Sequence, residues 1–231
     1  RGVPRARRMR VALDRREALR LPLALSAMLA PLAPLAPPPA SAISATTMSG
    51  KSKPELGVIL VDAPAQSGSS ITADAVLPGG RLAAISYESK FPLANGGYYD
   101  VETMATEGGD GSFVQIATLP KGDVNSLKKD WFLQTICSVT GRYGSYGAPI
   151  DAKVLADDKS GATRLLDISF TVLSPSMAEI PRRAVVSATQ PAGSSEIVML
   201  VSGCSATRWK KGGEAAAREA ASSFRVVGIS A

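Results

Sequence analysis

Short strand-like runs follow one another along most of this chain, and they limit its fold more than any other feature. The runs are rich in Val, Ile, Leu, Phe and Thr, and clusters of Gly, Pro, Asp or Ser bound them. They cover residues 56–61, 98–106, 112–119, 150–155, 164–172, 184–188 and 196–202. Residues 157–161 lie between two of these runs and have the composition of a hairpin loop. The pattern predicts a mainly antiparallel sheet.

Two further segments have the spacing of helices. Residues 124–137 place apolar side chains every three to four positions, and Asp123 precedes them as an N-cap. Residues 213–224 are rich in alanine, with Ala217 and Ala221 on one face. Strands followed by packed helices predict one α+β domain in which the helices lie on the sheet.

The first 42 residues differ sharply in charge from the rest of the chain. They hold eight arginines against one Asp and one Glu, and this excess equals the whole net charge of +6. Basic and acidic residues balance in residues 43–231, so the high pI of about 9.5 does not indicate a nucleic-acid partner.

The order of segments in residues 1–42 is typical of a two-part targeting peptide. An Arg-rich stretch precedes an apolar run at residues 21–35, which is followed by prolines and Ala40-Ser41-Ala42. Prolines interrupt the run, which disfavours a membrane anchor. We expect import into the chloroplast, export to the thylakoid lumen and cleavage after Ala42, with a bacterial secreted protein as the alternative. Residues 43–56 are then a flexible lead-in, and residues 57–231 form the single domain.

The composition excludes several kinds of active site. The chain has no histidine, so catalytic triads with histidine and His-ligated metal centres are excluded. Two cysteines, Cys137 and Cys204, cannot hold a four-thiolate cluster. They are either one disulfide or two separate buried thiols. With no activated nucleophile beside a base, we expect a protein that is not an enzyme.

A run at residues 45–52 loosely matches a phosphate-binding loop. That loop needs a strand before it and a helix after it, and this run has neither. We interpret the match as a coincidence.

Two segments combine basic and aromatic residues. Residues 141–147 carry three evenly spaced glycines with Arg and Tyr between them, as in an exposed contact loop or a plain connector. Residues 208–211 and the pair at 182–183 are the basic clusters outside the targeting peptide, and Trp209 is expected in the core. The expected docking residues are Arg142, Tyr143, Tyr146, Lys210 and Lys211.

Acidic pairs offer the only candidate cation ligands. Asp157 with Asp158 could hold Ca²⁺ weakly, as could Glu107 with Asp110, but neither pair has the spacing of an EF-hand. Solvated turns are the ordinary interpretation of such pairs. We expect no cofactor other than this weak calcium candidate.

The C-terminal residues resemble a known family. The matching stretches are Arg183-Ala184-Val185-Val186, Val198-Met199-Leu200-Val201, Arg208-Trp209-Lys210-Lys211-Gly212 and Ala221-Ser222-Ser223-Phe224-Arg225-Val226. Their order is similar to the end of PsbP-domain proteins, where a strand, a Trp-Lys turn and a terminal helix lead into Ser-Phe-x-Val. Residues 170–173 and 141–147 resemble the PsbP-like thylakoid lumenal branch. The likeness covers residues 112–228. The early aromatic motif of the photosystem II subunit has no counterpart near residues 87–99, which favours a divergent relative.

This resemblance implies an α-β-α sandwich around an antiparallel sheet, a lumenal location and a non-enzymatic role. It implies a peripheral protein that docks on the lumenal face of photosystem II or another thylakoid complex. Such a protein is an extrinsic subunit of the oxygen-evolving complex or an assembly factor. The alternative function is a lumenal module that binds or delivers calcium or manganese.

Overall fold

The computed structural model describes residues 58–78, 80–94, 101–106, 109–144 and 146–229. Several expected features lie outside these residues: the targeting peptide, its cleavage site, the lead-in and the match to a phosphate-binding loop at 45–52. No helix of the described residues is long and apolar enough to cross a membrane.

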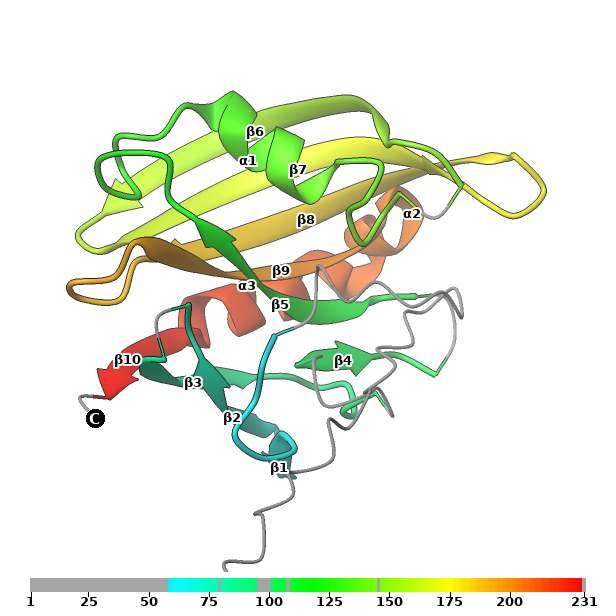
Figure 1. Cartoon of the computed structure of the whole chain (residues 1–231). Coiled ribbons are helices and arrows are strands. Elements are labelled where there is room, and N and C mark those ends of the chain that lie inside the picture. The colour runs from blue at the N-terminus through cyan, green and yellow to red at the C-terminus, as the bar shows by residue number, and fades with distance from the viewer. Residues whose placement is uncertain (1–57, 79, 95–100, 107–108, 145, 230–231) are drawn as a thin grey trace, which may run out of the picture. The chain divides into compact units, whose positions relative to one another are not determined.

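A six-stranded antiparallel sheet forms the middle layer of the described domain (Figure 1). Its strand order is β4-β5-β9-β8-β7-β6, and each neighbouring pair is antiparallel. The strands are β4 (Glu102–Met104), β5 (Gly111–Thr118), β6 (Ile150–Ser160), β7 (Thr163–Leu173), β8 (Glu179–Thr189) and β9 (Glu196–Ser205). This sheet confirms the mainly antiparallel arrangement that the sequence predicts.

A second, smaller antiparallel sheet was not expected from the sequence. Its order is β1-β2-β3-β10. The strands are β1 (Ala65–Ser67), β2 (Ser70–Val76), β3 (Leu82–Glu88) and β10 (Arg225–Ile229). Many of their residues are Ala and Ser, which have little intrinsic preference for strands. Their burial nevertheless alternates along β2 and β3, because one face packs inward.

Helices cover both faces of the six-stranded sheet. The helix α1 (Lys129–Ile136) lies on one face, and α3 (Glu214–Ser223) lies on the other face, where it also contacts β3 of the small sheet (Figure 1). Between β9 and α3, the chain makes a short helix, α2 (Ala206–Arg208), and a wide π-turn, η2 (Trp209–Gly213). The α+β class and the α-β-α layering are therefore confirmed, with the small sheet added beyond α3.

Each face of the six-stranded sheet has its own apolar core. On the α1 side, Phe132 and Ile136 pack with Leu166 and Phe170. The opposite core joins the sheet to α3 and the small sheet. Both faces of β9 are buried, which explains its uninterrupted apolar run.

Several boundaries differ from expectation. Residues 124–128 form turns, so the first helix begins only at Lys129. The hairpin turn lies at Gly161 and Ala162, because β6 continues to Ser160. The expected strand at 56–61 is reduced, within the described residues, to an isolated bridge from Leu60 to Ala75.

Candidate functional site: two hollows beside the start of β5

Two hollows on opposite faces of the six-stranded sheet share the residues Asp110 and Gly111. Successive side chains of a strand point to opposite faces. On the α3 side, the Ser112 hydroxyl donates to the Ser202 hydroxyl at 2.8 Å, whereas Phe113 joins the core on the α1 side. A Cβ at Gly111 would collide with the backbone carbonyl of Thr103 on β4, so this close approach requires glycine.

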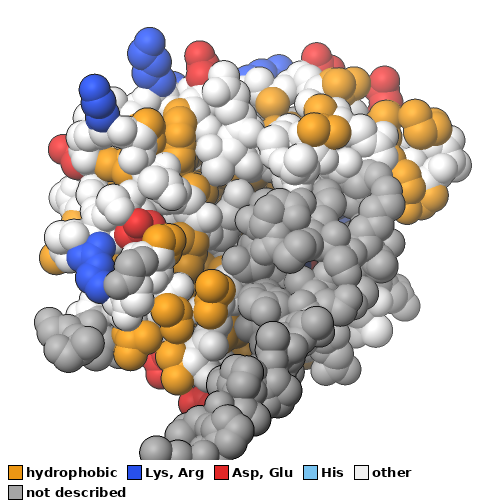
Figure 2. Space-filling model, viewed as in Figure 1, with side chains coloured by type: hydrophobic (Ala, Val, Ile, Leu, Met, Phe, Trp, Pro, Cys, Tyr) orange, Lys and Arg blue, Asp and Glu red, His pale blue; other side chains and the backbone are white. Residues whose placement is uncertain are grey.

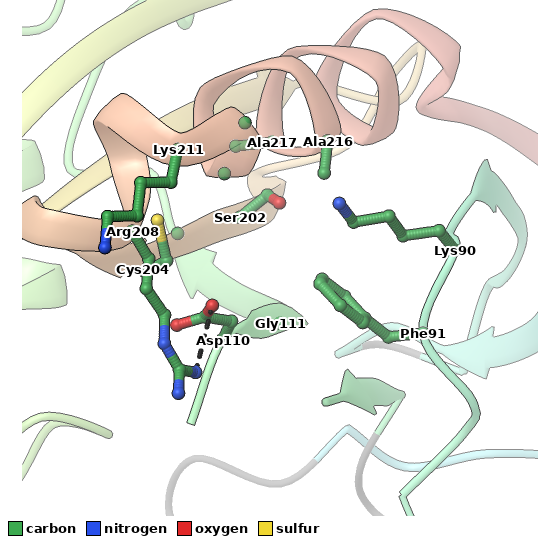
Figure 3. Close-up of a pocket in the computed structure, with 13 residues that line it drawn as sticks. Lys90, Phe91, Asp110, Gly111, Ser202, Cys204, Arg208, Lys211, Ala216 and Ala217 are labelled. Atoms are coloured by element: carbon green, nitrogen blue, oxygen red, sulfur yellow. Dashed lines mark ion pairs between the residues drawn. The ribbon is translucent and has the colours of Figure 1, made fainter. Parts of the chain in front are cut away.

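The hollow on the α3 side has a volume of about 190 Å³, and we call it the basic hollow. Its polar lining comes from Lys90, Asp110, Ser202, Cys204, Arg208 and Lys211. Figure 3 shows Lys90 reaching across it toward α3, with Phe91 at the rim. Arg208 forms an ion pair with Asp110 at 3.2 Å. Three basic side chains around one carboxylate give this hollow a positive balance that favours acidic groups.

The π-turn that carries Lys211 is fixed by a buried tryptophan. Trp209 is 5% exposed, and the Arg183 guanidinium lies 5.2 Å from its ring centre. Gly212 takes a positive φ of 99°, which lets the turn widen before α3. The next residues after Trp209, Lys210 and Lys211, are exposed. The expected core position of Trp209 is confirmed, and its two lysine neighbours are available to a partner.

The cysteines are two separate buried thiols, one of the two possibilities left by the sequence. Cys137 packs with the core on the α1 side, and Cys204 packs beside Trp209 on the other side. Burial raises the pKa of Cys137 to about 12 and also raises the pKa of Cys204. Neither thiol is thus prepared to act as a nucleophile at neutral pH.

The hollow on the α1 side has a volume of about 290 Å³, and we call it the apolar hollow. Three of the expected docking residues, Arg142, Tyr143 and Tyr146, line it. Arg142 forms an ion pair with Glu102, and each side chain is only 7% exposed. The expectation that Arg142 lies on an exposed contact loop is therefore wrong.

Tyr143 is partly buried and packs against the core on the α1 side. Its ring lies 4.6 Å from the ring of Phe170 and 5.7 Å from that of Phe113, measured between ring centres. The Arg182 guanidinium covers it at 5.4 Å, and burial raises the pKa of Tyr143 to about 12. Most of the ring therefore packs inside the fold, and docking through Tyr143 stays a prediction. Tyr146 is 39% exposed at the rim of the hollow.

The two candidate calcium ligands do not converge. Asp157 and Asp158 are successive residues of β6, so their side chains point to opposite faces. Both carboxylate oxygens of Asp157 accept hydrogen bonds from Arg164, at 2.8 and 2.9 Å. These bonds keep the pKa of Asp157 below its usual value. In the described part of the chain, no three His, Cys, Asp or Glu side chains gather as metal ligands. Glu107, of the other pair, is not described.

Several residues of the two hollows were not singled out from the sequence. Lys90 and Glu102 come from segments with no motif, and only their contacts in the fold reveal them. The pair at 182–183 was noted as a basic cluster, but strand alternation places Arg182 beside Tyr143 and Arg183 beside Trp209 on the other face. A strand assignment extended to Glu179 would have predicted this separation.

Comparison of structures gives a match where the two comparisons of sequence give none. No protein-family model matches the chain, and no curated protein matches it. Among solved structures, the solution structure of cyanobacterial PsbP (CyanoP) from Synechocystis sp. PCC 6803 is similar, with a TM-score of 0.37 and 12% identity. The match covers 74% of this chain and 94% of the other chain.

Proposed function

We propose that this chain is a non-enzymatic, PsbP-like protein of the chloroplast thylakoid lumen. It docks on the lumenal face of photosystem II or another thylakoid complex, as an extrinsic subunit or an assembly factor. Lys210 and Lys211 contact an acidic surface of that complex.

The observation that carries this proposal is the π-turn at Trp209–Gly213. It is the Trp-Lys turn of the sequence resemblance, and it lies between the strand β9 and the helix α3, in the order that the resemblance implies. Its tryptophan is buried and its two lysines are exposed. A fixed turn presents these charges with little loss of backbone entropy on binding, which favours recognition.

The positive charge at this turn is local. On the face seen in Figure 2, the Lys and Arg side chains stand apart from one another among uncharged and apolar ones. The basic hollow instead brings Lys90, Arg208 and Lys211 together. An acidic partner surface would therefore be steered to the turn and the hollow beside it.

A role without catalysis fits the chemistry of the chain. The sequence has no histidine, and burial raises the pKa of both cysteine thiols. General acid–base catalysis uses histidine most often, and a catalytic cysteine needs a lowered pKa.

Crosslinking mass spectrometry on isolated thylakoids tests this function. We expect crosslinks from Lys210 and Lys211 to lumenal loops of one photosystem, and release of the protein by a salt wash. A protein that stays free in the lumen and gives no crosslink to any thylakoid complex would rule the docking role out.

A further inference from the structure

We propose that the apolar hollow binds a small, mostly apolar carboxylate, whose carboxylate group is received by Arg182. This site lies on the opposite face of the sheet from Lys210 and Lys211. The proposal therefore stands whether or not the chain docks on a photosystem.

The hollow has the walls of a small-molecule site. Aromatic rings of Phe113, Tyr143 and Tyr146 and the aliphatic side chains of Val172 and Leu173 line it. Its volume of about 290 Å³ lies near the lower end of the range for ligand pockets and suits a molecule of one or two rings. Tyr146 at the rim leaves the hollow a route to solvent.

One polar group in this lining has an unused donor. The Arg182 guanidinium donates from Nη2 to the backbone carbonyl of Gly109 at 2.8 Å. Its Nε is buried and has no hydrogen-bond partner among the described residues. A buried donor without an acceptor costs free energy, so the fold does not use all the hydrogen-bonding capacity of this guanidinium.

The charged side chains around the hollow favour a negatively charged ligand. The other arginine of the hollow, Arg142, is already neutralised by Glu102, and the second carboxylate of the lining, Asp110, pairs with Arg208 from the other face. No carboxylate of the described residues forms an ion pair with Arg182, which instead covers the Tyr143 ring. The guanidinium fork binds carboxylates with charge-assisted hydrogen bonds. A carboxylate attached to a flat apolar body would place its oxygens at Arg182 and its rings against Phe113 and Tyr146.

The test is a titration of the purified protein with 2-naphthoate, followed by calorimetry and ligand-observed NMR. Its uncharged counterpart, 2-naphthylmethanol, is titrated in parallel. We expect saturable binding of 2-naphthoate and at least tenfold weaker binding of the alcohol, because only the carboxylate offers charged acceptors.

Matched variants locate the site. Arg182→Lys keeps the positive charge but removes Nε, and we expect it to weaken 2-naphthoate binding at least tenfold. Arg183→Lys is the control, since Arg183 is the next residue on β8, faces Trp209 and also has a buried, unpartnered Nε. Leu173→Trp should fill the hollow and block binding, with circular dichroism confirming the fold. Absence of saturable binding, or equal binding by the Arg182→Lys and Arg183→Lys proteins, would overturn the proposal.

Discussion

The basic hollow and the apolar hollow border the same two residues, Asp110 and Gly111, yet they use charge in opposite ways. In the basic hollow, Lys90 and Lys211 face solvent from a loop and a turn. In the apolar hollow, Arg142 is buried against Glu102, and Arg182 is stacked on Tyr143. A basic residue near a glycine-rich loop therefore does not by itself indicate a docking surface. The face of the sheet to which it points decides its role.

The largest expected effect comes from breaking the buried pair of the apolar hollow. Arg142→Ala removes the arginine that pairs with the buried Glu102 carboxylate, and we expect a loss of about 3–5 kcal/mol in the free energy of unfolding. Chemical denaturation measures it. The double variant Glu102→Leu/Arg142→Met should recover most of the loss, since it removes both charges. A loss below about 1 kcal/mol for Arg142→Ala would show that this arginine is not structural.

A second buried pair on the same face predicts a dependence on pH. Arg164 is 1% exposed and bonds both oxygens of Asp157 as well as the backbone carbonyls of Val124 and Leu127. The folded protein keeps the pKa of Asp157 below its unfolded value of about 3.9, so folding favours the ionised carboxylate. Its stabilisation is complete above that unfolded value and is lost as pH falls toward the lower folded pKa.

The Asp157→Asn variant measures this contribution. At neutral pH we expect it to be less stable by about 1.5–3 kcal/mol, the usual range for a hydrogen bond to a charged group. The difference from wild type should shrink as the pH drops below about 4, because Asp157 of the unfolded wild-type chain then takes up a proton while the folded carboxylate stays ionised. Urea unfolding at a series of pH values, from neutral to acid, measures the difference in stability and how it changes with pH. A difference that stays constant through the acid range would contradict the assignment.

The smallest effect on stability is expected in the basic hollow. Lys210 and Lys211 are exposed and form no ion pair among the described residues, so Lys210→Ala/Lys211→Ala should change the free energy of unfolding by less than about 0.5 kcal/mol. Thermal unfolding of this variant and of Arg142→Ala compares the two losses of stability. A large loss in the lysine variant would make the π-turn a structural element instead of a contact surface.

The sequence predicted the central sheet and the helix on each face because those segments have strong patterns. Residues 196–202 form a long apolar run, and residues 213–224 have alanines at helical spacing. The small sheet was missed because β2 and β3 depend on burial against α3 more than on residue preference. Tertiary contacts, which a single sequence does not display, define those strands.

The site was predicted only in part, for a related reason. Trp209 and its lysines lie in one short segment, so local sequence was enough to separate the buried ring from the exposed charges. Arg142 meets Glu102 forty positions away, and Tyr143 meets Phe170 across the sheet. Arg and Tyr in a glycine-rich loop are common in exposed contacts, and only the fold shows that Arg142 and Tyr143 pack inward.

The measurement that tests the account most directly is rebinding of the purified protein to salt-washed thylakoid membranes. We predict that Lys210→Ala/Lys211→Ala weakens rebinding about tenfold or more and makes it less sensitive to salt. The matched control is Lys121→Ala/Lys153→Ala, which removes the same charge from exposed positions outside both hollows and should rebind like wild type. Equal rebinding by the two double variants would contradict the claim that the basic hollow and its π-turn are the docking surface.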